Sequence, residues 1–209
     1  MTVNSRKTDA RTKLLDAALG LIRQKGYAAT SVDDLCRAAG VTKGAFFHHF
    51  RSKDDLAVAA ARYWGEMTGA MFAQADYHRL ADPVARILGY VALRRQLLAG
   101  EVAEFTCLAG TMVQEAFDSS PGIRAACADA ILGHAATLEA DIAAAMESRG
   151  LEAQEWSPSS LALHIQAVLQ GAFILAKATG GAAAAAACVD HLDRYIRLLF
   201  GEDAGQSPV

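Results

Sequence analysis

Apolar residues along the chain recur every three or four positions, which is the period of a helix with one buried side. The first stripe of this kind follows Asp9 and ends at Gly26, and glycine commonly ends a helix. A second, short stripe begins after Thr30 or Ser31, whose hydroxyls can cap a helix, and it ends at Gly40. The pattern therefore predicts one helix of several turns, a short turn, and a helix of about two turns.

The next stretch predicts two further helices in quick succession. Thr42 can cap a third, short helix, and Ser52 can cap a fourth that runs to about Met67. Two short helices joined by a tight turn that contains Gly40 form a helix-turn-helix. We therefore expect an N-terminal DNA-binding domain over residues 1–55 and a second domain over residues 56–209.

Beyond residue 56 the glycine, proline and Ser-Pro signals fall between helical patterns, and no stretch has a credible strand pattern. The fold class predicted is all-α, with a three-helix N-terminal domain and a C-terminal domain of about six helices. Five of the expected helical stretches cover residues 82–100, 105–117, 123–150, 157–181 and 183–200.

Charge is divided unevenly along the chain. Residues 1–53 hold ten Lys and Arg against four acids, a balance of +6, while the whole chain has a net charge of −3. A basic N-terminal part suits a protein that presents one end to a polyanion such as DNA. Chance clustering of solvated charges is the simpler alternative.

Several classes of protein and site are disfavoured by the sequence. No uninterrupted apolar run reaches the ~18–20 residues of a membrane span, and residues 1–13 lack a secretory core, so we expect a cytoplasmic protein without a membrane partner. The four cysteines, Cys36, Cys107, Cys127 and Cys188, are widely separated, which predicts reduced thiols rather than disulfides or zinc ligands. We expect no cofactor.

A contiguous motif narrows the functional class. It runs from Thr30-Ser31-Val32-Asp33-Asp34-Leu35 through Thr42-Lys43-Gly44-Ala45-Phe46-Phe47-His48-His49-Phe50 to Leu56, after Lys25-Gly26-Tyr27. This stretch resembles the DNA-binding motif of tetracycline-repressor-like (TetR) transcription regulators. The resemblance implies a homodimeric repressor that a small molecule releases from a palindromic operator.

Eight residues are predicted to contact DNA. A helix that begins at Thr42 presents free N–H groups to phosphate, and Gly44 and Ala45 lack bulk that would hinder approach to base edges. Val32, Leu35, Val41, Phe46 and Phe50 are expected in the core instead. The predicted DNA-binding residues are Thr30, Thr42, Lys43, Gly44, Ala45, Phe47, His48 and Lys53.

The family usually has tyrosine where this chain has Phe47, so one hydrogen bond to phosphate is expected to be missing. His48 and His49 are adjacent, which suggests a metal pair at first sight. Because neighbouring side chains on a helix diverge, we expect no metal there.

The C-terminal helices over residues 157–200 carry apolar residues on more than one side, so each needs a second partner. The family resemblance implies that they pair with a second copy in a four-helix dimer interface. Packing within one chain is the alternative explanation.

Small ligands in such folds lie between helices of the C-terminal domain. The candidate ligand-binding residues are Phe105, Cys107, Met112, Trp156, His134, Gln166, Phe173 and Lys177, and all of them except Lys177 also suit a core position. Cys107 lies in a segment that resembles one branch of the family, some of whose members respond to electrophiles. If Lys177 lies near Cys107, its charge would favour a reactive thiolate; an inert thiol with Lys177 in solvent is the alternative.

Two other functional classes fit the sequence less well. An enzyme would need a nucleophile with its base, a metal site or a phosphate-binding loop, and none of the common motifs for these occurs. A helical interaction or scaffold protein would account for the C-terminal helices but not for the basic helix that contains Gly44. We therefore expect a DNA-binding regulator that is not an enzyme.

Overall fold

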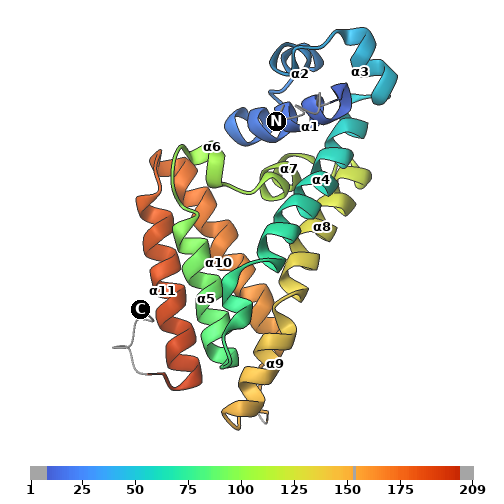
Figure 1. The fold of residues 1–209 in the computed structure, drawn as a ribbon. Coiled ribbons are helices and arrows are strands. Elements are labelled where there is room, and N and C mark those ends of the chain that lie inside the picture. The colour runs from blue at the N-terminus through green and yellow to red at the C-terminus, as the bar shows by residue number, and fades with distance from the viewer. Residues whose placement is uncertain (1–8, 153, 203–209) are drawn as a thin grey trace, which may run out of the picture. The chain divides into compact units, whose positions relative to one another are not determined.

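The computed structural model describes residues 9–152 and 154–202, and every regular element within them is helical (Figure 1). The predicted all-α fold class is therefore confirmed. The elements are α1 Ala10–Lys25, α2 Val32–Ala39, α3 Lys43–His49, α4 Lys53–Ala73, the 3-10 helix η1 Asp76–Arg79, α5 Pro83–Gln96, α6 Val102–Phe105, α7 Leu108–Ala116, α8 Pro121–Ala136, α9 Glu139–Ser148, α10 Pro158–Thr179 and α11 Ala183–Phe200.

The chain forms two compact units. The first contains the described residues up to Glu66 together with Leu108–Ala130, and the second contains Met67–Cys107 with the described residues from Ile131 onward. Both α4 and α8 therefore contribute to each unit. Compactness alone does not test the domain boundary expected between residues 55 and 56, which stays a prediction.

The first unit begins with the helices that the sequence predicted. Asp9 caps α1 by accepting a hydrogen bond from the backbone N–H of Thr12 at 2.7 Å. Ser31, rather than Thr30, caps α2, in a reciprocal capping box with Asp34. The side chains that fill the core of this unit include Leu14, Leu15, Ala18, Ile22, Leu35, Phe46, Phe50, Leu56 and Ile123.

The second unit is a bundle in which α10 packs along α11, and α5 packs on both α9 and α11 (Figure 1). Ser157 caps α10 and Pro158 occupies its first turn, where a missing N–H costs nothing. Gly180 and Gly201 end α10 and α11 in the left-handed conformation, as the predicted ends of these helices require. The shared core includes Tyr90, Val91, Ile142, Ile165, Leu169, Val189, Leu192 and Ile196.

Two helices expected from the sequence differ in the structure: the first begins later than expected, and the second is broken in two. The stretch 105–117 is interrupted where Thr106 adopts an extended backbone, with φ −79° and ψ 157°, so that α7 starts only at Leu108. The stretch 123–150 is interrupted at Thr137, whose hydroxyl donates to the carbonyl of His134 at 2.7 Å. Threonine hydroxyls that bond nearby backbone groups compete with the helix, which explains the second break.

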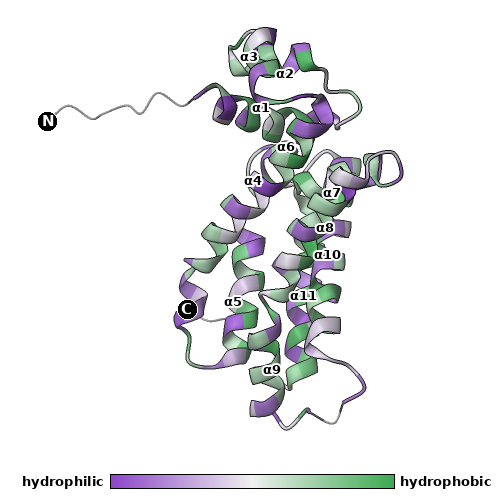
Figure 2. Ribbon diagram, turned by 90° about the vertical axis from the view of Figure 1, so that its right-hand side faces the viewer, coloured by the Kyte–Doolittle hydropathy of each residue, from purple (hydrophilic) through white to green (hydrophobic). Residues whose placement is uncertain are grey.

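The helix α10 is long and apolar enough, by length and composition alone, to cross a membrane, and 44% of its most apolar window is buried in the protein. Core helices of soluble proteins pass the same test. Leu161, Ile165 and Leu169 are buried in the second unit. In Figure 2 the ribbons change between hydrophobic and hydrophilic along most helices, as expected for helices with one buried side.

Candidate nucleic-acid interface

The N-terminal turn of α3 is exposed and capped. Thr42 precedes the helix with an extended backbone, and its hydroxyl accepts a hydrogen bond from the N–H of Ala45 at 3.1 Å. Because that hydroxyl accepts here, its own proton remains available to an acceptor outside the protein. Thr42, Lys43 and Gly44 are all exposed, so this turn can be approached by a ligand as large as a DNA duplex.

Lys43 is held by a neighbouring carboxylate. Its Nζ lies 2.8 Å from Oδ1 of Asp33, and the two side chains are 60% and 57% exposed. The hydrogen bond to Asp33 raises the pKa of Lys43, so the ammonium is charged at any working pH. An exposed pair of this kind is weak, and a phosphate can replace Asp33 as the partner of Lys43.

Gly44 leaves open space on α3. A Cβ atom built at this position would have the Thr42 hydroxyl, 3.7 Å away, as its nearest neighbour. The protein itself therefore does not require glycine here. The open space leaves room for a close external surface, and the predicted DNA contact of Gly44 stays a prediction.

The aromatic residues of α3 divide between core and surface. Phe46 is fully buried, whereas Phe47 is 57% exposed and meets the Phe46 ring edge-on at a centroid distance of 5.1 Å. Of the two histidines, His48 is exposed and its ring lies 4.9 Å from that of His49. Among the described residues no group of three potential metal ligands occurs at this or any other place.

Lys53 has an internal role that the sequence did not predict. Its Nζ donates to the carbonyl of Tyr27 at 3.1 Å and lies 4.2 Å from the centre of the Tyr27 ring. The Tyr27 hydroxyl in turn donates to Asp54 at 2.6 Å, and burial together with this carboxylate raises the pKa of Tyr27. Lys53 thus joins the start of α4 to the turn after α1, and the predicted phosphate contact would use its remaining N–H groups.

Thr30 does not lie where a phosphate contact through its hydroxyl was expected. Its side chain is 1% exposed, and its Oγ1 donates to the carbonyl of Gly26 at 2.7 Å. The physical reason is the turn between α1 and α2, whose backbone carbonyl is satisfied by this hydroxyl. The structure therefore assigns Thr30 a place in the fold and leaves seven of the eight predicted DNA-binding residues exposed or half-buried.

The turn that precedes α2 is fixed by a residue far along the chain. Oε2 of Glu115, on α7, accepts a hydrogen bond from the N–H of Ala28 at 2.7 Å. At Gly26, where φ is +90°, a Cβ would meet Oε1 of Glu115 at 2.5 Å. Sequence reasoning missed this contact, because nothing near Glu115 indicates a partner 87 positions away.

The candidate ligand-binding residues are distributed over both units. Met112 is buried in the first unit, and the others lie in the second. Gln166 and Phe173 are buried there, whereas Lys177 is exposed on α10. The half-buried residues are Phe105, Cys107, His134 and Trp156. Their role as ligand contacts stays a prediction.

Two of these candidates join residues that sequence reasoning had not selected. The hydroxyl of Tyr90 is 3.0 Å from Nε2 of His134 and accepts hydrogen bonds from Nε2 of Gln166 at 3.0 Å and Nε of Arg94 at 2.8 Å. We call these four residues the Tyr90 cluster. Burial, with a smaller effect of the Arg94 charge, lowers the pKa of His134 from 6.5 to about 4, so its ring is neutral at pH 7.

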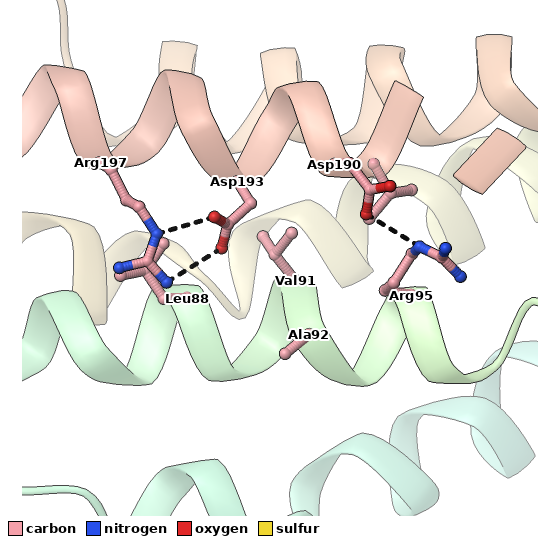
Figure 3. Close-up of a pocket in the computed structure, with 8 residues that line it drawn as sticks. Leu88, Val91, Ala92, Arg95, Asp190, Asp193 and Arg197 are labelled. Atoms are coloured by element: carbon pink, nitrogen blue, oxygen red, sulfur yellow. Dashed lines mark hydrogen bonds and ion pairs between the residues drawn. The ribbon is translucent and has the colours of Figure 1, made fainter. Parts of the chain in front are cut away.

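A groove on the second unit lies between α5 and α11 (Figure 3). Leu88, Val91 and Val189 are its buried apolar residues. Two ion pairs border it, Arg95 with Asp190 at 2.9 Å and Arg197 with Asp193 at 2.7 Å (Figure 3). None of the predicted ligand-binding residues lines this groove.

Comparison with known proteins finds a family pattern over the N-terminal helices. The family pattern "Bacterial regulatory proteins, tetR family" matches residues 14–60, which include α2 and α3. The transcriptional regulator AcuR of Cereibacter sphaeroides is 30% identical over 106 residues, which are 51% of this chain and 48% of that protein. The chain thus aligns with about half the length of this curated relative.

Solved structures extend the likeness of the fold. A TetR transcriptional regulator from Chloroflexus aurantiacus is 27% identical and has a TM-score of 0.75 over 90% of this chain and 93% of that one. The regulatory protein TetR from Rhodobacter sphaeroides is 24% identical and has a TM-score of 0.78 over 89% and 98%. The resemblance seen in one short motif therefore extends, as a fold, over most of the chain.

Proposed function

Because the chain belongs to the tetR family of bacterial regulatory proteins, we propose that it is a transcription regulator whose α3 enters the major groove of an operator. The observation that carries this proposal is the exposed, capped start of α3, where Gly44 leaves space that the protein itself does not use. Six other residues complete the proposed surface, namely Thr42, Lys43, Ala45, Phe47, His48 and Lys53.

The regulator acts as a homodimer in this proposal. The outer sides of α10 and α11 expose large apolar residues, and Leu198 is 79% exposed. The others are Leu163, Ile174, Leu175 and Tyr195. Apolar side chains gathered on two neighbouring helices are the usual surface of a subunit interface, and a dimer would place two copies of α3 on two operator half-sites.

Release from DNA is the regulated step in this proposal. A small molecule that binds the second unit in only one of two conformations would shift the protein toward a state with lower operator affinity. Cys107 offers a second way, because it lies half-buried directly before α7. Modification of its thiol would then have the same effect as a ligand. Catalysis has no part in this mechanism, and we propose the cytoplasm as its location.

The proposal is tested with the full chain and a duplex from upstream of its own gene. We expect specific binding at physiological ionic strength and a loss of about tenfold or more in the Lys43→Ala variant. Arg124→Ala, which removes one charge from an exposed position on α8, is the matched control. Equal affinity for the upstream duplex and a random duplex would refute the proposal and favour an interaction or scaffold protein instead.

The role of Cys107 needs a separate test. Treatment with an alkylating agent is expected to lower operator affinity in the native protein and in a Cys188→Ser variant, but not in Cys107→Ser. Cys188 is also half-buried, which makes it a suitable comparison. Unchanged operator affinity after complete alkylation of Cys107 would exclude the thiol switch and leave the DNA-binding proposal intact.

A further inference from the structure

Arg94, on α5, is half-buried and held in a defined orientation. Its Nε donates to the Tyr90 hydroxyl at 2.8 Å. Its guanidinium lies 4.2 Å from the centre of the Phe72 ring and 5.2 Å from that of Tyr90. These contacts fix the plane of the guanidinium. They leave the edge formed by its two Nη atoms for another partner.

The hydrogen bonds of the Tyr90 hydroxyl are fully used within the cluster. Its oxygen accepts from Arg94 and from Gln166, so its single proton is donated to Nε2 of His134, 3.0 Å away. The proton of the neutral His134 ring then lies on Nδ1. The cluster therefore supplies no negative charge, and all of its groups serve to hold Arg94 in place.

Three other arginines of the second unit have a carboxylate partner, whereas Arg94 has none in the described part of the chain. Arg86 pairs with Asp141 at 2.7 Å, Arg95 pairs with Asp190, and Arg197 pairs with Asp193. Among the described residues no Asp or Glu lies within ion-pair distance of Arg94. A half-buried guanidinium with only π contacts and a neutral hydroxyl carries a positive charge that the protein leaves uncompensated.

The Nη atoms of Arg94 are also within reach of solvent. Within the described part of the chain, the buried polar side-chain atoms without a partner consist of the Thr106 hydroxyl alone. The Nη groups have no hydrogen-bond acceptor in the same residues, so they are not enclosed. A small ligand can therefore reach them from the solvent.

We propose that Arg94 binds the carboxylate of a small organic acid. Two Nη–H groups on one edge of a planar guanidinium match the two oxygens of a carboxylate. The neighbouring rings of Phe72, Tyr90 and His134, with centroids 4.7 to 5.7 Å apart, favour a flat, apolar remainder. That such an acid would be the effector rests on the function proposed above, whereas its binding does not.

Direct binding is measured without DNA, by calorimetry and by the melting temperature of the full chain. The probes are acetate, benzoate and cinnamate, each beside its uncharged amide. We expect at least one acid to bind and its amide to bind about tenfold more weakly or worse, because a charge-assisted bidentate contact is lost. Failure of all three acids up to 10 mM, or equal binding of acid and amide, would overturn the proposal.

The variant Arg94→Gln identifies the site, and Arg95→Gln is its matched control, since the next residue of α5 already has Asp190 as its partner. We expect a loss of acid binding of about tenfold or more in Arg94→Gln and less than about twofold in Arg95→Gln. Equal losses in the two variants, or none in Arg94→Gln, would contradict the assignment.

A second measurement keeps the proposal testable if Arg94→Gln does not fold. The His134 ring packs on Phe72 of α4 and bonds the Tyr90 hydroxyl of α5, and the charged group that lowers its pKa is Arg94. A carboxylate on Arg94 would offset that charge. The pKa of His134, followed by NMR in the native protein, should rise when the acid binds; an unchanged value would place the acid elsewhere.

The two proposals fail separately. If an acid binds through Arg94 but the protein binds its upstream duplex no better than a random duplex, the acid site is supported and the regulatory function is refuted. If the protein binds its operator and no acid binds, the regulatory function is supported and the acid site is refuted.

Discussion

At the residue scale, Gly44 is the residue of α3 whose lack of a side chain matters most for the proposed DNA contact. Gly44 costs helix stability, and the structure gives it no internal contact that a methyl group would disturb. In the proposed function, the open space at Gly44 admits a base edge of the operator. A substitution at Gly44 can therefore change the stability of the fold and the affinity for DNA independently of each other.

For Gly44→Ala we expect these two properties to change in opposite directions. The free energy of unfolding should rise by up to about 1 kcal/mol, because alanine is the better helix former. Operator affinity should fall about tenfold or more, because the methyl group would occupy the space proposed for a base edge. Thermal unfolding and fluorescence anisotropy measure the two effects.

Gly20→Ala is the control for this substitution. Gly20 is exposed in α1 and a Cβ there would have no neighbour within 4 Å. The stability gain should be similar, with operator affinity unchanged. Unaltered DNA binding in Gly44→Ala would remove Gly44 from the interface.

His134 should make stability depend on pH in a defined window. Its pKa is lowered to about 4 in the folded protein by burial and by Arg94, against 6.5 as its ordinary value. The unfolded chain therefore binds a proton first as the pH falls, and the stabilisation present above pH 6.5 is lost progressively toward pH 4. We expect a loss of roughly 2–3 kcal/mol, measured by urea unfolding.

His134→Gln should flatten this part of the profile. Asp34, whose pKa is lowered by hydrogen bonds from Lys25 and Ser31, also loses its stabilising contacts in acid, but only below its ordinary value of 3.8. The two effects therefore occupy different pH ranges. A slope between pH 4 and 6.5 that survives in His134→Gln would show that another group is responsible.

Individual roles were harder to predict than the motif that contains them. The exposed start of α3 follows from local signals, namely a capping threonine and a glycine, and both were readable. The phosphate contact of Lys53 stays a prediction. The bond of Thr30 to the Gly26 carbonyl and the contact of Lys53 with the Tyr27 ring were not readable. Such roles depend on partners brought together by folding, as does the Tyr90 cluster, whose members come from three helices.

At the element scale, the exposed apolar residues of α10 and α11 test the homodimer. Leu198→Glu places a charge where the proposed interface excludes water, so the dissociation constant of the dimer should rise about 100-fold or more. Sedimentation velocity over a range of concentrations measures it. The change should not unfold the subunit, since Leu198 is 79% exposed in the single chain.

Leu132→Glu is the comparison for the dimer test. Leu132 lies on α8 and is 53% exposed, so the same charge is introduced outside the proposed interface. Its dimer should keep the native dissociation constant. Equal weakening in both variants, or none in Leu198→Glu, would argue for another mode of association or for a monomer.

Helices were predictable where caps and periodicity agree, as at Ser157-Pro158 before α10 and Gly201 after α11. The breaks at Thr106 and Thr137 were not, because both threonines lie inside stretches whose apolar spacing continues. The hydroxyl of Thr106 is buried without a partner among the described residues, so local hydrogen bonding does not explain the first break. The apolar period alone therefore overestimates helix length here.

At the scale of the whole molecule, the uneven charge predicts a strong salt dependence. Residues 1–53 carry ten bases and four acids in a chain whose net charge is −3. DNA affinity should fall by about 100-fold or more between 50 and 200 mM salt, because each phosphate contact releases counterions. For Lys43→Ala, the slope of log K against log salt should be shallower by about 2 per dimer.

The control for this measurement is again Arg124→Ala, which changes the net charge equally and should leave the slope as it is. A slope that responds equally to both variants would mean that net charge, rather than a contact at α3, governs binding.

The all-α class and the basic N-terminal part were predictable because both are averages over many residues. The division into two units was not, since Leu108–Ala130 joins the N-terminal helices through contacts distant in sequence.

The turn after α1 has a consequence for how this chain can vary. Gly26 is constrained twice, by a φ of +90° and by the Glu115 carboxylate that occupies the place of a side chain. Gly40 has a φ of +63° and open space around it. In a library containing every substitution at both positions, asparagine should survive selection at position 40, whereas position 26 should retain glycine alone. Variation at position 26 would require Glu115 to change first.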